Sequence, residues 1–246
     1  MDRLLELTSQ AETSHFWFRG FRQFVAPLLA RAAAGRTRPR LLDCGCGTGH
    51  NIRTLLQPLG AAYGLDLTAA GLALARRTGR PLVRADATRI PFMSGAFDIV
   101  TSFDMLQCVP DDEGALREIA RVIAPGGHLV GSVAALEMLH GDHSVLSEEV
   151  RRYTRAGLTA RLERAGLRPL HVRYAFASVF PLVLGVRALH RARGAAATGQ
   201  EITVPPAPVN AALTALVSGE AALARVLPMP IGSSLVFLAS KSHHQR

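Results

Sequence analysis

The chain of 246 residues has little of several features that mark particular protein classes. It has three cysteines, Cys44, Cys46 and Cys108, and two of them lie in a glycine-rich segment, so we expect no disulfide framework. No apolar run reaches the roughly 18 residues that a membrane-spanning helix needs. The N-terminal sequence MDRLLE lacks the basic and then apolar order of a secretion signal. We therefore expect a cytoplasmic protein.

Lysine is almost absent, because Lys241 is the one lysine among 28 basic residues. The formal net charge of +9 raises the question of a nucleic-acid partner. The arginines are scattered, however, and none forms a dense run interleaved with aromatic residues. We attribute the excess of arginine and alanine to a GC-rich bacterial genome and do not expect nucleic acid as a substrate.

The apolar pattern predicts an α/β fold. Hydrophobic residues make up 48% of the chain and charged residues 19%, which suffices for a sizeable core. Short apolar runs alternate with helical patterns from 40 to 133, which is typical of βαβ units and a parallel sheet. Strands are predicted at 40–44, 61–65, 81–85, 97–102, 128–133, 168–174 and 233–240. Helices are predicted at 50–57, 68–77, 111–123, 155–165 and 209–227, and a turn at 125–127.

The segment LLDCGCGTG at 41–49 has the pattern of a nucleotide-binding turn. A strand ends in an acid, Asp43, and is followed by closely spaced glycines, which allow positive φ and a close approach of a ligand to the backbone. Dinucleotide folds use G-x-G-x-x-G, whereas the third glycine here comes one residue earlier. Two further acids, Asp66 and Asp86, end the second and third predicted strands. A plain strand-to-helix turn, and acids that serve only as caps, are the alternatives.

Taken together, these residues resemble motif I of the class I S-adenosylmethionine-dependent methyltransferases, E/D-x-G-x-G-x-G. The segments FDIV at 97–100 and LREIARVIAPGG at 116–127 are similar to the methyltransferase-11 type domain, and the resemblance covers roughly residues 40 to 135. It implies a Rossmann-like sheet of seven mostly parallel strands, the last one antiparallel, with helices on both faces and a helical insertion before the last strand. It also implies S-adenosylmethionine as the cofactor and methyl transfer to an O, N or C atom.

The resemblance assigns roles to particular residues. Asp43 would hold the cofactor ammonium, Asp66 the ribose hydroxyls, and Asp86 the adenine amine, with the backbone N–H of Ala87 beside the ring. The full set of expected cofactor-binding residues is Trp17, Arg19, Asp43, Gly45, Cys46, Gly47, Gly49, Asn51, Asp66, Leu67, Asp86, Ala87 and Phe103.

The segment HFWFRGFR at 15–22 resembles a leader of a bacterial methyltransferase subgroup, which folds over the cofactor as a lid. In that role Trp17 or Phe18 would shield the sulfonium and Arg19 would meet the cofactor carboxylate. The alternative is a helix that packs its aromatic residues on the sheet.

The acceptor side is expected just past the fifth strand, where the sequence resembles the same subgroup. His140 or His143 are candidate bases, and loop histidines without chemistry are the alternative. Three candidate ligands in four residues with no fourth are poor support for a metal, so none is expected. The residues expected to line the acceptor are Phe18, Gln107, Arg152 and Tyr153. Gln107 stands where these enzymes often carry histidine, which weakens the case for a base there.

The expected divisions are an N-terminal helical lid (1–39), a cofactor-binding core (40–175), a helical insertion (176–232) and the last strand with the tail (233–246). The apolar stretch at 176–186 is followed by basic residues. It could lie in a membrane interface, cap an apolar acceptor pocket or form a dimer contact. We expect a small, apolar or natural-product-like acceptor and a monomer or homodimer.

Two other functions remain open at this point. The fold could use the cofactor structurally or for a reaction other than methylation, or the chain could be an NAD-type oxidoreductase. The sulfonium already carries a good leaving group, so positioning can supply most of the catalysis without a strong base.

Overall fold

A computed structural model describes residues 2–141, 144, 147–185 and 204–242. The strands are β1 (Arg40–Cys44), β2 (Ala61–Asp66), β3 (Leu82–Arg84), β4 (Phe97–Phe103), β5 (Ile123–Ala134), β6 (Leu167–Ala175) and β7 (Ser234–Lys241). The longer helices are α1 (Asp2–Ala11), α2 (Phe16–Ala33), α3 (Ala69–Ala75), α4 (Asp112–Val122), α6 (Arg155–Arg164) and α8 (Ala207–Leu223). Short helical turns are η1 (Ile52–Leu56), η2 (Arg76–Thr78), η3 (Leu106–Cys108) and η4 (Glu137–Leu139). Residues 180–185 are helical as well.

The strands form one sheet in the order β3-β2-β1-β4-β5-β7-β6. Strands β1 to β5 pair in parallel, and β7 pairs antiparallel with both β5 and β6. The predicted mixed seven-stranded sheet with an antiparallel last strand is therefore confirmed. In such a sheet the carboxyl ends of the parallel strands meet at one edge, which is where open α/β folds bind ligands.

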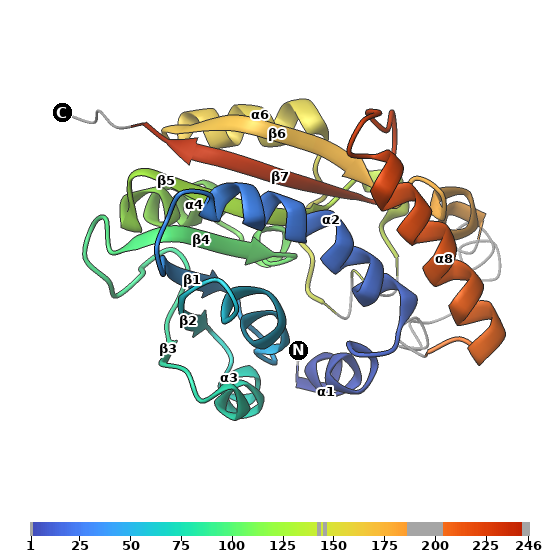
Figure 1. Ribbon diagram of the computed structural model, residues 1–246, viewed down its shortest axis with the longest axis horizontal. Coiled ribbons are helices and arrows are strands. Elements are labelled where there is room, and N and C mark those ends of the chain that lie inside the picture. Colours follow the sequence, from blue (N-terminus) through green and yellow to red (C-terminus); the bar gives the residue numbers. More distant parts are fainter. Residues whose placement is uncertain (1, 142–143, 145–146, 186–203, 243–246) are drawn as a thin grey trace.

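Each face of the sheet is covered by helices, because successive strand residues point to opposite sides. Leu42, Val100 and Phe237 belong to a core that includes residues of α4 and α6. Their neighbours Leu41 and Ile99 belong to a second core that includes residues of α2 and α8. Figure 1 shows α2 lying along one face of the sheet and α8 crossing beside the first turns of α2.

Two local expectations differ from the structure. The turn predicted at 125–127 lies within β5, which begins at Ile123; the pairing with β4 shifts between Phe97 and Ile99, and Gly126 takes φ +72° in this bulge. The helix predicted at 50–57 contains the π-helical turn η1, in which the N–H of Gln57 donates to the carbonyl of Ile52.

Helix α8 of the insertion is joined to the N-terminal segment by polar contacts and close packing. The side chain of Asn210 accepts from the N–H of Phe16 and donates to the carbonyl of Ser14, which fixes the start of α2. Farther along, Gly20 meets α8 so closely that an added methyl group would lie 2.3 Å from Cγ1 of Val217. The N-terminal and insertion helices thus form one packed layer.

Candidate active site

The glycine loop follows β1, and its acid is held inside the sheet. Asp43 is 1% exposed, and its carboxylate accepts a 2.7 Å hydrogen bond from Oγ1 of Thr101 on the neighbouring β4. Burial raises the pKa of Asp43 to about 7, the Thr101 hydrogen bond opposes this, and the nearby Asp66 adds to it. The described part of the chain gives Asp43 no cationic partner, so the site has an unmet preference for a positive charge.

Two more acids gather at the same edge of the sheet. After burial, the charges of Asp43, Asp66 and Asp86 all raise the pKa of the Cys44 thiol at the end of β1. Asp66 accepts from the N–H of Gly47 at 2.7 Å and from the N–H and hydroxyl of Thr68, the N-cap of α3. A carboxylate has about four acceptor positions, so Asp66 must exchange the Gly47 contact to accept from two further hydroxyls. The exposed Asp86 accepts from the N–H and hydroxyl of Thr88.

The backbone around these acids adopts conformations that suit a close-fitting loop. Gly45 and Gly49 have φ values of +81° and +76°, and a side chain at either position would collide with Met105 or Ala75. A side chain at Gly47 would instead meet its nearest atom only at 3.6 Å, on Leu5 of α1. The loop therefore packs tightly against α3 and the segment that follows β4, and it leaves its backbone open on the side of α1.

Strained residues mark the carboxyl ends of three further strands. Asp104 directly follows β4, Leu136 follows β5 and Phe176 directly follows β6, and all three have φ between +51° and +62°. Such conformations are costly for residues other than glycine and gather at functional sites. The strain thus lies at the edge where the fold places ligands.

The N-terminal segment covers the glycine loop. The Glu12 carboxylate accepts a 2.6 Å hydrogen bond from the Thr48 hydroxyl and lies 3.5 Å from Nδ1 of His50. Burial lowers the pKa of His50 to about 4, helped by Arg22 and Arg53, so this imidazole is neutral at neutral pH and its contact with Glu12 is not an ion pair. Burial also raises the pKa of Glu12, against the Thr48 hydrogen bond.

Comparison with known proteins adds to this geometry. A methyltransferase domain family matches residues 42–131, which contain the glycine loop and all three acids. The chain carries a class I methyltransferase domain.

Curated relatives share this domain rather than the whole chain. A phthiotriol/phenolphthiotriol dimycocerosates methyltransferase of Mycobacterium leprae is 38% identical over 96 residues, which are 37% of this chain and 36% of the relative. A trans-aconitate 2-methyltransferase of Deinococcus radiodurans is 32% identical over 138 residues, 55% of this chain and 53% of the relative. The chain thus matches between about a third and a half of the length of these relatives.

Solved structures extend the likeness in fold beyond the domain. Phosphoethanolamine N-methyltransferase 2 of Haemonchus contortus, in complex with S-adenosyl-L-methionine, has a TM-score of 0.62 and 16% identity, covering 98% of this chain and 57% of that one. The [4+2]-cyclase SpnF has a TM-score of 0.59 and 22% identity, covering 90% and 81%.

The residues expected to hold the cofactor lie along one edge of the sheet, apart from those in the leader. Gly45, Cys46, Gly47 and Gly49 follow β1 directly, and the half-buried Asn51 follows them. Leu67 is 61% exposed beside Asp66, Ala87 is buried beside Asp86, and Phe103 packs edge-on against Phe21 of α2 with ring centres 5.1 Å apart. Their contacts with a cofactor stay a prediction.

The leader residues point in two directions. Trp17 stacks on Phe176, with ring centres 3.9 Å apart and planes 3° from parallel. Arg19 is exposed and lines a groove on the outer side of α2. Phe18 is half-buried and edge-on to His15. Of these three residues, only Trp17 contacts one of the strained residues at the carboxyl ends of the strands, namely Phe176.

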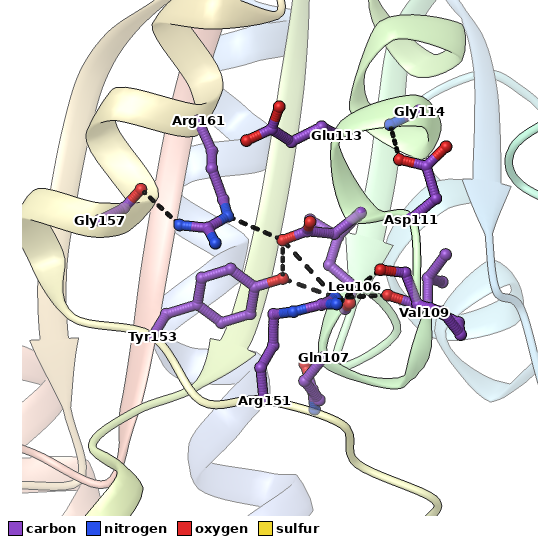
Figure 2. Close-up of polar contacts among 12 residues, drawn as sticks. Leu106, Gln107, Val109, Asp111, Glu113, Gly114, Arg151, Tyr153, Gly157 and Arg161 are labelled. Carbon is purple, nitrogen blue, oxygen red and sulfur yellow. Dashed lines mark hydrogen bonds and ion pairs between the residues drawn. The ribbon is translucent and has the colours of Figure 1, made fainter.

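The residues expected on the acceptor side take part in the protein's own contacts. The Tyr153 hydroxyl donates to Asp112 at 2.7 Å, and Arg151 and Arg161 converge on the same carboxylate (Figure 2). Arg152 pairs with Glu149 at 3.0 Å, and the amide of Gln107 lies 3.5 Å from the N–H of Ala134. Burial, followed by Asp112, raises the pKa of Tyr153, so its phenol keeps its proton.

Of the two candidate bases, His140 is half-buried just after η4, and His143 lies outside the described residues. Among the described residues, no group of three His, Cys, Asp or Glu side chains could hold a metal ion.

Several residues of the site were missed from the sequence. Thr101 and Glu12 act through partners 58 and 36 residues away, so no local pattern indicates them. The strained residues Leu136 and Phe176 carry no signal either, because leucine and phenylalanine rarely adopt positive φ, whereas Asp104 is of a residue type that does so more often.

Proposed function

We propose that this protein is an S-adenosylmethionine-dependent methyltransferase that acts on a small, apolar acceptor. The observation that carries the proposal is Asp43, a buried carboxylate beside the glycine loop without a cationic partner among the described residues. In a protein of net charge +9, three acids gather at this one edge. S-adenosylmethionine brings an ammonium and a sulfonium, and both charges suit such a site.

Each acid would serve a separate part of the cofactor. Asp43 accepts from the ammonium, directly or through water, and the Thr101 hydroxyl keeps the carboxylate oriented. Asp66 gives up its contact with Gly47 and accepts from the ribose hydroxyls. Asp86 accepts from the adenine amine, and the exposed side chain of Leu67 contacts the adenosine. These positions fit the cofactor, which supplies a methyl group bound to a good leaving group.

The chain's contribution to the transfer would be positioning. Phe103, Phe21 and Met105 surround the end of β4 with apolar surface, and Trp17 and Phe176 extend it. Apolar walls exclude water and hold an acceptor atom in line with the methyl group. We retain His140 and His143 as candidate bases and Phe18, Gln107, Arg152 and Tyr153 as candidate acceptor contacts.

Calorimetric titration with S-adenosylhomocysteine, S-adenosylmethionine and NADH tests the cofactor part of the proposal. We expect binding of the first two and none of NADH. Because an ionised Asp43 is needed, affinity should fall as the pH drops below about 7, by up to about tenfold per pH unit. The Asp43→Asn variant should lose most of the binding and this pH dependence, whereas tight NADH binding alone would overturn the proposal.

Transfer of a labelled methyl group to a panel of phenols, quinones, sugars, lipids and natural-product scaffolds tests the reaction. Methylation of an apolar member supports the acceptor class. Binding of S-adenosylhomocysteine without transfer to any acceptor would favour the alternative of a methyltransferase fold with another use of the cofactor.

A further inference from the structure

Helix α8 turns its polar side chains toward the protein and apolar side chains toward solvent, the reverse of an ordinary surface helix. Its only charged residue, Glu220, is buried and accepts from the N–H groups of Ala177 and Ser178 and from the Ser178 hydroxyl. The polar side chains of Asn210 and Ser218 face the N-terminal segment as well, where Ser218 accepts from Gln23 at 2.8 Å. Every polar group that would normally solvate a surface helix therefore points inward.

The outward face of α8 is apolar as a result. Val209, Leu216 and Leu223 follow one another at intervals of seven residues, which places them on one side of the helix. The next turn adds Val226 and Leu227, whose N–H groups both donate to the carbonyl of Leu223. These five side chains are 47% to 74% exposed, and we call them the α8 stripe. Large apolar side chains that are exposed along one side of a helix suit an interaction surface.

A basic groove adjoins the stripe. Arg225 stands within the last turn of the stripe and also lines a groove of about 680 Å³ beside α2. Arg19 and Arg22 line the same groove, its remaining walls are mostly apolar, and none of the lining residues is acidic. Arg22 donates to the backbone oxygen of Glu12, while Arg19 and Arg225 are exposed. Burial lowers the pKa of Arg22; the Glu12 charge opposes this and the Arg19 charge adds to it. Because three arginines and no acid line the groove, its lining carries an excess of positive charge.

We infer that the α8 stripe and this groove dock the protein on an anionic lipid bilayer. No helix among the described residues is long and apolar enough to span a membrane, so the contact is a peripheral one. An interfacial helix buries its apolar face at the boundary of headgroups and acyl chains, and basic side chains beside it meet acidic headgroups. Arg225 lies between Leu223 and Val226, so a basic side chain for the headgroups and apolar side chains for the acyl chains occur at the same place.

The charge favours a bilayer over a second copy of the chain. A two-fold interface sets the same patch against itself, so the arginines of one copy would lie near those of the other. None of the described residues that line the groove is an acid, and Glu12, whose charge acts on Arg22, lies outside the lining, so Arg19 and Arg225 have no acid beside them in the groove. Acidic headgroups supply the missing negative charge.

Flotation of the full-length protein with lipid vesicles tests the inference. We expect co-flotation with vesicles that contain roughly one-third phosphatidylglycerol, weaker binding to pure phosphatidylcholine, and loss of binding at high salt. The double variant Leu216→Asp, Leu223→Asp should reduce the bound fraction by about tenfold or more. Val226→Asp, in the exposed turn that follows α8, and Arg225→Glu should each reduce it as well.

Matched variants on another surface serve as controls. Met93→Asp changes an apolar side chain that is 83% exposed, and Arg80→Glu reverses an exposed charge beside β3; both should float like the parent protein. Sedimentation velocity without lipid tests the competing possibility that the α8 stripe forms a dimer contact. If the protein does not float, or if the stripe variants dissociate a dimer while flotation is unchanged, the inference is wrong.

Discussion

At the scale of single residues, Asp43 joins cofactor binding to stability. Its pKa is about 7 in the folded protein and near 3.8 in an unfolded chain. Between these values the folded state holds more protons than the unfolded state, so stability falls as the pH rises from about 4 to 7. A difference of about three pKa units corresponds to roughly 4 kcal/mol at most. Ionisation of Asp43 thus lowers the stability of the folded protein, and a bound cation would offset this loss.

We therefore expect Asp43→Asn to stabilise the protein without ligand at pH 8, by on the order of 2–4 kcal/mol, because the amide can still accept from Thr101 and needs no ionisation. At pH 5 the gain should be smaller. Urea unfolding at both pH values measures it, with Asp86→Asn as a control that changes an exposed carboxylate. A variant less stable than the parent at pH 8 would contradict this account.

A second prediction concerns Tyr153, which is buried with its hydroxyl on Asp112. Tyr153→Phe should lower stability by about 1 kcal/mol through the lost hydrogen bond. It should leave kcat/KM nearly unchanged, because the variant keeps the aromatic ring as a candidate acceptor contact and loses only a hydroxyl that is bonded to Asp112. Thermal unfolding and steady-state kinetics separate the two effects. A large loss of kcat/KM at full stability would instead favour the acceptor contact expected from the sequence.

At the scale of elements, the crossing of α2 and α8 depends on the absence of a side chain at Gly20. A methyl group there would collide with Val217, whose branched side chain has little freedom in a helix. We expect Gly20→Ala to destabilise the protein by about 1–3 kcal/mol, despite the better helix propensity of alanine. The matched variant Gly219→Ala, with nothing within 4 Å of its new methyl group, should be stabilising by about 0.5–1 kcal/mol. Chemical denaturation measures both, and equal effects would show that the two helices do not pack as described.

The elements themselves were predictable where their signal is local. The apolar runs predicted the place of all seven strands, and the bounds of six of them to within two residues, because each buried strand is an uninterrupted or alternating apolar segment. The start of β5 at Ile123 was missed, since Pro125 and two glycines are typical of a turn and the bulge depends on pairing with β4. The inverted face of α8 was missed for the same reason, because its polar residues find partners in segments nearly 200 residues away.

At the scale of the whole molecule, binding at the glycine loop should be felt in the N-terminal segment. Leu5 lies over Gly47, and Glu12 accepts from Thr48, so ordering of the loop restrains α1 as well. We expect S-adenosylhomocysteine to slow amide exchange by about tenfold in both the loop and α1, while the paired strands β6 and β7 stay unchanged.

The Glu12→Ala variant separates this coupling from direct contact with the ligand. It removes the carboxylate that accepts the hydrogen bond from the Thr48 hydroxyl, and it leaves the glycines in place. Ligand should then still protect the loop but protect α1 much less, because protection at α1 requires the hydrogen bond between the two segments. If ligand instead speeds exchange in α1 of the parent protein, the segment competes with the cofactor for the loop, and α1 must open before binding rather than close upon it.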